Sequence, residues 1–167
     1  LVWRAARTPD AEAYRAFDEA RQSWVSLTWA QAHERVGRWS RALARLALPS
    51  GARVAILLPN GLDALSIDQA TLALGHVPVP LHAIDNPGSI AYILSDCDAS
   101  LLVLEDAEQW QRIQAVGTPL PQLKGVVLTR PGARSEATAT VPVIALTDWL
   151  ARATRHAPLQ TPPCAAD

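Results

Sequence analysis

The chain has 167 residues, 49% of them hydrophobic, and a mean hydropathy of +0.06, which suits one domain with a sizeable core. Its formal net charge of −1 argues against a nucleic-acid or anionic-membrane surface. The chain holds no apolar run of about 18 residues, so no transmembrane segment is expected.

The first 50 residues are expected to form a β-hairpin and a helix. Residues 13–18 and 23–27 alternate in part between apolar and polar types, with a short polar connection between them. Thr28 and Gln31 fit a capping box. The helix that follows carries apolar residues at intervals of three and four, which predicts packing on a sheet. These residues are Trp29, Ala32, Val36, Trp39, Leu43 and Leu46. Pro49-Ser50-Gly51 is expected to end the helix.

The rest of the chain alternates apolar runs of strand length with helical patterns. The expected strands are residues 54–58, 77–81, 101–104, 126–128 and 141–146. The expected helices are residues 62–74, 90–94, a segment beginning at Asp106 that carries Trp110 and Ile113, and residues 147–154. Two prolines make the strand at 77–81 irregular or place it at a sheet edge. Residues 130–140 are polar and aperiodic, which predicts a mobile loop.

Three short signals mark helix ends in this region. Gly75 is expected to end the second helix, Asn86-Pro87 to begin the third, and Asp106 to cap the fourth. The alternation predicts an α/β fold with a mostly parallel sheet and helices on both faces. We expect a single partial domain over residues 1–167. It would comprise a hairpin segment (1–27), βαβ units (28–154) and a linker tail (155–167).

The common nucleotide-binding and hydrolytic motifs are absent from the sequence. No G-x-G-x-x-G or phosphate loop occurs, and the only lysine, Lys124, precedes a strand. Ser66, Ser89 and Ser95 lack a G-x-S-x-G context. His33, His76, His82 and His156 are not spaced as metal ligands.

Histidines and aspartates allow a structural or a functional interpretation. His76 and His82 flank the proline-rich strand, either as hydrogen-bonded turn residues or as a pocket wall at a strand end. Five aspartates are candidate acids and are interpreted as structural: Asp63, Asp68, Asp85, Asp96 and Asp98. Asp63 is expected in a first helical turn, where the helix dipole favours its charge, and Asp96 and Asp98 near a helix end.

Aromatic residues and cysteines receive structural interpretations. Trp29, Trp39, Trp110 and Trp149 are expected to pack in the core or on the sheet. Only Cys97 and Cys164 are present, which predicts a reduced, cytoplasmic chain with one buried and one tail cysteine. The N-terminus lacks the apolar region of a signal peptide.

Four phrases in order resemble the start of the large domain of AMP-forming acyl-CoA synthetases, most closely the long-chain fatty acyl type. They are SLTWAQAHERVGRWSRAL, RVAILLPNG, ALGHVPVPLHA and SIAYILSDCDASLLVLED. The resemblance implies the N-terminal subdomain of an ATP-dependent ligase. Such a ligase forms an acyl-adenylate and then a thioester, using ATP, Mg2+ and coenzyme A.

The family's phosphate loop, ribose aspartate, magnesium glutamate and catalytic lysine have no match here. No catalytic, cofactor-binding or metal-binding residue is therefore assigned, and the isolated chain is expected to be inactive. Gly75 is either a helix C-cap or a wall of the coenzyme A or acyl channel. The expected partners are a fatty acid or other carboxylate, the rest of the same large domain and a C-terminal domain.

Two alternatives remain open. The parent could be a fatty acyl-AMP ligase or load a carrier protein instead of coenzyme A. In a different class, the chain could be a non-catalytic interaction module with a flavodoxin-like sheet. Exposed apolar surface on a truncated sheet also predicts self-association.

Overall fold

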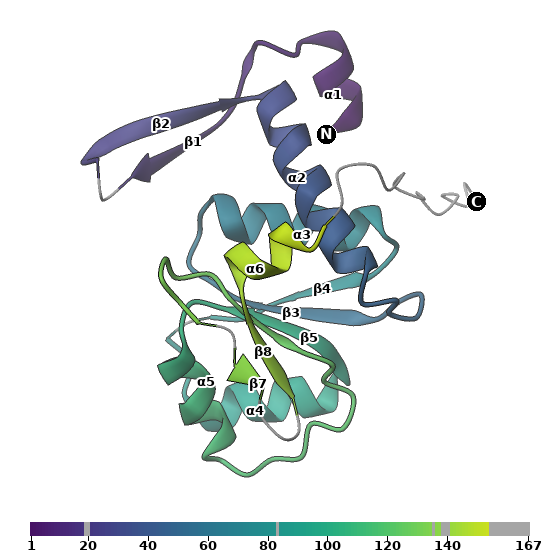
Figure 1. The fold of residues 1–167 in the computed structure, drawn as a ribbon, viewed down its shortest axis with the longest axis vertical. Coiled ribbons are helices and arrows are strands. Elements are labelled where there is room, and N and C mark those ends of the chain that lie inside the picture. Colours follow the sequence, from purple (N-terminus) through teal and green to yellow (C-terminus); the bar gives the residue numbers. More distant parts are fainter. Residues whose placement is uncertain (19–20, 83, 135, 138–140, 154–167) are drawn as a thin grey trace.

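The computed structural model of the chain describes residues 1–18, 21–82, 84–134, 136–137 and 141–153 (Figure 1). Its helices are α1 (Val2–Arg7), α2 (Trp29–Ala44), α3 (Leu62–Ala73), α4 (Pro87–Asp96), α5 (Ala107–Gln114) and α6 (Leu146–Ala151). Its strands are β1 (Glu12–Asp18), β2 (Ser23–Thr28), β3 (Arg53–Leu57), β4 (Val77–Pro80), β5 (Ala99–Leu104), β6 (Val126–Leu128), β7 (Glu136–Ala137) and β8 (Pro142–Ala145).

Six strands form one sheet in the order β4-β3-β5-β6-β8-β7. All neighbours are parallel except β7, which runs antiparallel to β8. The predicted α/β fold is therefore confirmed. The strand with Pro78 and Pro80 lies at the edge, where missing N–H donors cost the sheet least, and this prediction is also confirmed.

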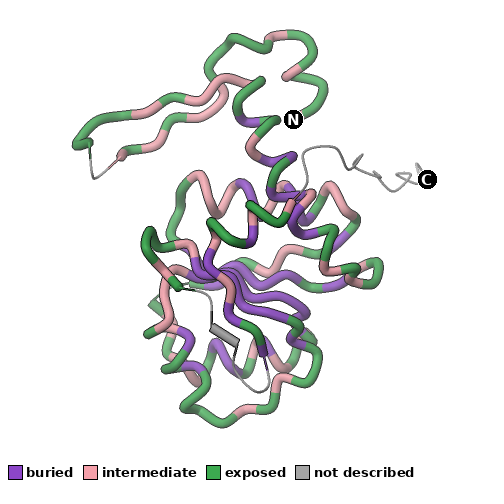
Figure 2. Tube along the Cα trace, in the orientation of Figure 1, coloured by how far each residue is buried: buried purple, intermediate pink, exposed green. Residues whose placement is uncertain are grey.

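Helices cover both faces of the sheet and divide the core into two clusters. On one face, α4 and α5 pack through residues such as Leu94 and Trp110 onto Leu102 and Leu104. On the other face, α2, α3 and α6 pack against alternate residues of the same strands. Every residue of β5 is buried, as the continuous apolar run predicts (Figure 2).

The helix ends follow from the local sequence. Thr28 and Gln31 make the reciprocal capping box, and the side chains of Asn86 and Asp106 each accept a backbone N–H of the following helix. Gly75 follows α3 with φ of +71°, a conformation that favours glycine. These four positions confirm the expected helix boundaries.

The hairpin β1–β2 is present as predicted and projects away from the sheet and its helices (Figure 1). It hydrogen-bonds to no other strand that the structure describes. Exposed apolar side chains gather here and on α1: Phe17, Trp24, Val2 and Trp3. Self-association through such a surface stays a prediction.

Several expectations need correction. The helix α1 was not foreseen, because a single short turn with no buried residue leaves no periodic pattern. Two residues of the expected 130–140 loop, Glu136–Ala137, form strand β7, which pairs with β8 and is too short to show an alternating pattern in the sequence. The helix α2 ends at Ala44, before Leu46 and Pro49. The helix α4 begins at Pro87, as the Asn86-Pro87 signal predicts, and continues to Asp96, two residues beyond the expected end at Leu94.

The last helix begins at Leu146 and ends at Ala151, so the expected range of 147–154 is too long within the described residues. The expected tail from residue 155 onward and Cys164 lie outside them. Cys97 is half-buried rather than buried, and desolvation raises the pKa of its thiol. None of the described helices is both long and apolar enough to cross a lipid bilayer.

Three of the four tryptophans considered above are in the core. Trp39, Trp110 and Trp149 are almost fully buried, and the rings of Trp39 and Trp149 meet edge to face at 5.6 Å. Trp29 is only half-buried, so its core assignment is wrong. It lies at the start of α2, where its ring contacts Tyr14 at 5.7 Å.

Candidate functional site

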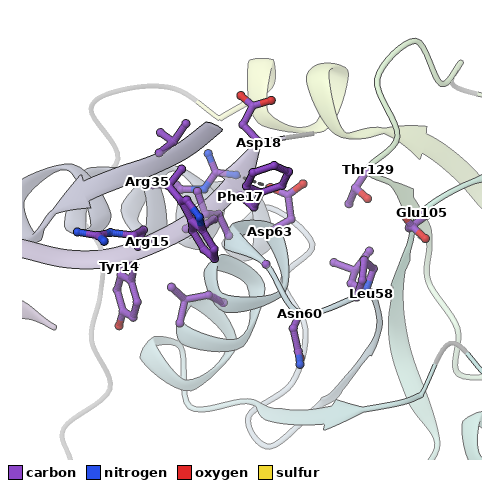
Figure 3. Close-up of a pocket in the computed structure, with 17 residues that line it drawn as sticks. Tyr14, Arg15, Phe17, Asp18, Arg35, Leu58, Asn60, Asp63, Glu105 and Thr129 are labelled. Atoms are coloured by element: carbon purple, nitrogen blue, oxygen red, sulfur yellow. Dashed lines mark hydrogen bonds and ion pairs between the residues drawn. The ribbon is translucent and has the colours of Figure 1, made fainter. Parts of the chain in front are cut away.

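A hollow of about 840 Å³ lies at the carboxyl ends of the central strands (Figure 3). Residues 58–61 follow β3, Glu105 follows β5 and Thr129 follows β6, and all of them line it. The hairpin forms the opposite wall through residues such as Tyr14 and Phe17. Two parts of the chain that are distant in sequence therefore enclose one space.

The strand order places this hollow at a topological switch point. The chain leaves β3 through α3 toward β4 on one side, and leaves β5 through α5 toward β6 on the other. The connections diverge between β3 and β5, so a crevice opens beside Leu58 and Glu105. Open α/β sheets bind ligands at such a crevice.

Glu105 and Thr129 are held beside each other by the strand ends. The Thr129 N–H donates to the Leu104 carbonyl at 3.0 Å, and the Arg130 N–H donates to the Glu105 carbonyl at 2.8 Å. The Arg130 guanidinium also pairs with Asp106 at 2.9 Å. These bonds extend the pairing of β5 and β6 into the loops and fix the floor of the hollow.

A charged network joins α2 to α3 at the side of the hollow. The Arg35 Nη2 donates to Asp63, and the Arg35 Nε donates to the Ser66 Oγ at 2.9 Å. Ser66 in turn donates to the Leu62 carbonyl of its own helix. Asp63 is in the first turn of α3, as predicted, where the helix dipole favours its charge.

The other charges at the hollow are largely occupied. Arg15 pairs with Glu12 at 2.9 Å, and hydrogen bonds from Ser26 and Arg15 lower the pKa of Glu12. Asp18 pairs with Arg21 at 3.6 Å. The carboxylate of Glu105 has no ion-pair partner among the residues that the structure describes.

The charged groups that line the hollow do not fit a nucleoside triphosphate. The lining has two arginines, both bound to carboxylates, against three carboxylates, which disfavours a polyanion. The N-terminus of α3 faces the hollow, but Asp63 occupies the first turn, where a phosphate would otherwise be favoured. The described part of the chain therefore supplies a wall beside a switch point, and the residues that line the hollow form no phosphate cradle.

A smaller hollow of about 520 Å³ adjoins the first and shares residues 58–61 with it. It lies at the ends of β3 and β4, and its polar lining includes Asn60, Asp68 and His82. His82 therefore lies in a pocket wall at a strand end, the functional interpretation given above. No group of three potential metal ligands occurs among the described residues.

His76 is buried and lines neither hollow. Burial lowers the pKa of its imidazole, which a hydrogen bond to the Pro49 backbone partly opposes. Its Nδ1 finds no partner among the described residues. The structure therefore supports the interpretation of His76 as a buried turn residue rather than a pocket wall.

Gly75 also lines neither hollow, and its C-cap conformation supports the structural alternative. Asp85, Asp96 and Asp98 are likewise absent from both linings. That no residue here is catalytic or cofactor-binding stays a prediction.

The sequence reasoning overlooked Asn60, Glu105 and Thr129 as site residues. One signal was available, because each of them comes within three residues of the end of a predicted buried strand, where parallel sheets bind ligands. Arg35 carried no such signal. Its partner Asp63 is 28 residues away, and only helix packing brings the two together.

Comparison with known proteins gives a consistent family match. The AMP-binding enzyme family matches residues 1–163. The Drosophila melanogaster long-chain-fatty-acid–CoA ligase heimdall is 25% identical over 104 residues, which are 62% of this chain and 15% of that protein. The sulfoacetate–CoA ligase of Cupriavidus necator is 28% identical over 138 residues, which are 81% of this chain and 26% of that protein.

Solved structures agree with this match. A Mycobacterium tuberculosis fatty acyl CoA synthetase superposes with a TM-score of 0.66 and 25% identity, covering 97% of this chain and 28% of that one. A putative long-chain-fatty-acid CoA ligase from Rhodopseudomonas palustris superposes with a TM-score of 0.72 and 23% identity. The match covers 93% of this chain and 35% of that chain. The latter likeness concerns the fold alone.

The chain spans 15% and 26% of the lengths of the two relatives named above. The family match nevertheless covers nearly all of its own residues. The chain belongs to the AMP-binding enzyme family.

Proposed function

We propose that this chain is the N-terminal subdomain of an ATP-dependent, AMP-forming acyl-CoA ligase. In such an enzyme a carboxylate oxygen attacks the α-phosphate of ATP, releasing pyrophosphate and leaving an acyl-adenylate. The thiol of coenzyme A then attacks the acyl carbon and displaces AMP. The match of the AMP-binding enzyme family over residues 1–163 carries this proposal.

Within that enzyme, the chain's own residues serve as scaffold. The Arg35–Asp63 network ties α2 to α3, and Glu105 and Thr129 border the crevice. The poor fit of the lining to a triphosphate supports this division of labour. We infer that the groups for ATP, Mg2+ and coenzyme A come from the rest of the large domain and a C-terminal domain.

The substrate we favour is a fatty acid, because several relatives are named long-chain-fatty-acid–CoA ligases. The sulfoacetate–CoA ligase has a higher identity over a longer match, which keeps smaller carboxylates in the test panel. A parent that stops at the adenylate, or passes the acyl group to a carrier protein, is a variant of the same proposal. The cytoplasm, where ATP and coenzyme A are available, is its proposed location.

The non-catalytic interaction module has one observation in its favour. The order β4-β3-β5-β6-β8 equals the 2-1-3-4-5 order of flavodoxin-like sheets, a fold that serves many functions. An open reading frame that ends near Asp167 would favour this module. A frame that continues into a glycine- and threonine-rich loop would favour the ligase.

The test uses the protein encoded by the complete reading frame. It is incubated with ATP, Mg2+ and carboxylates ranging from sulfoacetate to long-chain fatty acids, and pyrophosphate release is measured. Hydroxylamine trapping reports the adenylate, and thioester formation with coenzyme A or a carrier protein identifies the acceptor. The 167-residue chain serves as the control and is expected to release no pyrophosphate. Failure of the complete protein on every carboxylate would refute the ligase proposal, and adenylate formation by the 167-residue chain would refute the scaffold role.

A further inference from the structure

The loop between β3 and α3 contains an asparagine followed directly by a glycine, Asn60-Gly61. In such a pair, the backbone nitrogen of the second residue can attack the side-chain amide carbon of the asparagine. Glycine favours this attack because it has no Cβ to hinder the approach and its backbone rotates freely. The chain has one other asparagine, Asn86, which precedes Pro87, whose backbone nitrogen carries no hydrogen. The local sequence therefore favours this reaction at Asn60 and disfavours it at Asn86.

The fold leaves both reacting groups of this pair free. Asn60 and Gly61 are exposed, and neither belongs to a helix or a strand (Figure 3). Among the described residues, the Gly61 N–H donates to no backbone carbonyl, and the Asn60 side chain makes no hydrogen bond. The side chain of Asn86, by contrast, accepts the backbone N–H of Ser89 at 2.9 Å. The two asparagines therefore differ in structure as well as in sequence.

The position of the pair at the start of α3 favours the reaction electrostatically. The helix begins at Leu62, and its first backbone N–H groups give this end a partial positive charge. The attacking nitrogen becomes anionic when it loses its proton, and the negative charge then moves to the side-chain oxygen of the asparagine. The helix end stabilises both charges. The carboxylate of Asp63 in the first turn opposes this effect only in part, because it is paired with Arg35.

We propose that Asn60 is a site of intramolecular deamidation. The deprotonated backbone nitrogen of Gly61 bonds to the Cγ of Asn60, the bond from Cγ to the side-chain nitrogen breaks, and that nitrogen takes up a proton and leaves as ammonia. Water then opens the cyclic imide at either carbonyl, giving an aspartyl or an isoaspartyl linkage. In sum, one amide and one water become one carboxylate and one ammonium ion. The reaction needs no ligand, so it does not depend on the proposed function.

The new carboxylate would change both hollows at once, because Asn60 lines both of them. It would join Asp63 and Glu105 in the larger hollow and Asp68 in the smaller one. The formal net charge of the chain would go from −1 to −2. The isoaspartyl product would also lengthen the main chain by one methylene group directly before α3. The crevice should therefore repel anions more strongly after the reaction.

The test incubates the folded chain at mildly alkaline pH and follows the peptide that contains residues 58–64 by mass spectrometry. Deamidation adds about 1 Da to this peptide, and the isoaspartyl form is a substrate for protein isoaspartyl methyltransferase. We expect the change at Asn60 and none at Asn86 in the same sample. The rate should rise by up to about tenfold per unit of pH, because the deprotonated fraction of the backbone amide rises in that proportion. Equal modification of the two asparagines, or a rate that does not depend on pH, would overturn the proposal.

The variant Gly61→Ala tests the attacking residue. The φ of Gly61 is 177°, an extended backbone that any residue adopts, and an added Cβ would meet only the Pro59 carbonyl oxygen, at 3.9 Å. The variant should therefore fold, and its deamidation should be about tenfold or more slower, because the new methyl group hinders the attack. Gly37→Ala is the matched control, since it makes the same change inside α2 and should leave the rate unaltered. If Gly61→Ala reacts as fast as the control, the proposal fails.

A synthetic peptide of residues 58–64 separates the contribution of the fold from that of the local sequence. Asn60 in the folded chain should react no more than about tenfold slower than in this peptide, because its loop is exposed and no described hydrogen bond restrains the side chain. A greater slowing, or an Asn60 that stays intact in the folded chain while the peptide reacts, would mean that the fold protects the site and would refute the proposal.

Discussion

The Arg35–Asp63 pair offers a direct test of how the wall of the hollow is held. Asp63→Asn keeps the shape of the side chain and removes its charge. It leaves the guanidinium of Arg35, a side chain that is 36% exposed, without its counter-charge, so that neutral acceptors alone remain: the amide oxygen of the new asparagine and the hydroxyl of Ser66. The expected result is a less stable junction between α2 and α3.

The size of the loss follows from the burial of the pair. Exposed ion pairs contribute about 0.2–1 kcal/mol, and breaking a buried pair costs about 3–5 kcal/mol. With side chains 36% and 33% exposed, and with solvent screening, about 1.5 kcal/mol is reasonable. The first-turn position of Asp63 adds about 0.5 kcal/mol through the helix dipole. A total of about 2 kcal/mol corresponds to a drop of roughly 4–8 °C in melting temperature for a chain of this size.

Urea unfolding measures the free energy of unfolding of three variants: Asp63→Asn, Arg35→Met and the double variant that combines them. We expect a coupling free energy of about 1 kcal/mol between the two positions. Asp68→Asn is the matched control, because Asp68 is on the same helix and its side chain bonds only Gln69 among the described residues. A loss no larger than that of the control, or a coupling near zero, would refute the reasoning.

Three further predictions concern stability. Burial lowers the folded-state pKa of His76, so the unfolded chain takes up the proton first as the pH falls. Stability should therefore be full above about pH 6.5 and fall below it toward the folded-state pKa, and His76→Gln should reduce this slope in urea titrations between pH 7.5 and 5. Leu102→Ala, at a fully buried position, should cost about 3 kcal/mol in urea unfolding, whereas Leu72→Ala, 53% exposed, should cost less than about 1. Gly75→Ala should cost about 1 kcal/mol because its φ is +71°, whereas Gly37→Ala inside α2 should gain about 0.5 kcal/mol in thermal unfolding.

Each of these predictions has a contrary result. If the unfolding free energy depends on pH equally with and without His76, another titrating group is responsible for that dependence. Equal losses at Leu102 and Leu72 would contradict the burial of the central strand. A stabilising alanine at Gly75 would contradict its left-handed backbone.

Much of the local structure could be read from short sequence patterns. The capping box at Thr28 and Gln31, the helix start at Asn86 and the cap at Asp106 depend on residues within one turn of each other. The buried run of β5 needs no partner to be recognised as apolar. By contrast, β7 could not be recognised in the sequence, because a strand of two residues is too short to show a pattern.

The candidate site was less accessible to sequence reasoning. Asp63 was placed correctly in its helix turn, but its pairing with Arg35 depends on how α2 packs against α3. Trp29 and Trp39 lie on the same predicted stripe, yet only Trp39 is in the core. The reason is that Trp29 is at the helix end beside the hairpin, and no periodicity encodes that position.

By itself, the sequence determined the types of most elements, the edge character of the Pro78–Pro80 strand and the family resemblance. These depend on local propensity and on the order of apolar runs along the chain. The tertiary structure alone decided which strands are neighbours. It brought residues 58–61, Glu105 and Thr129 to one crevice and set the hairpin over them. Parallel pairing joins strands through long crossovers, so many strand orders are compatible with one sequence pattern, and only packing of both sheet faces selects one.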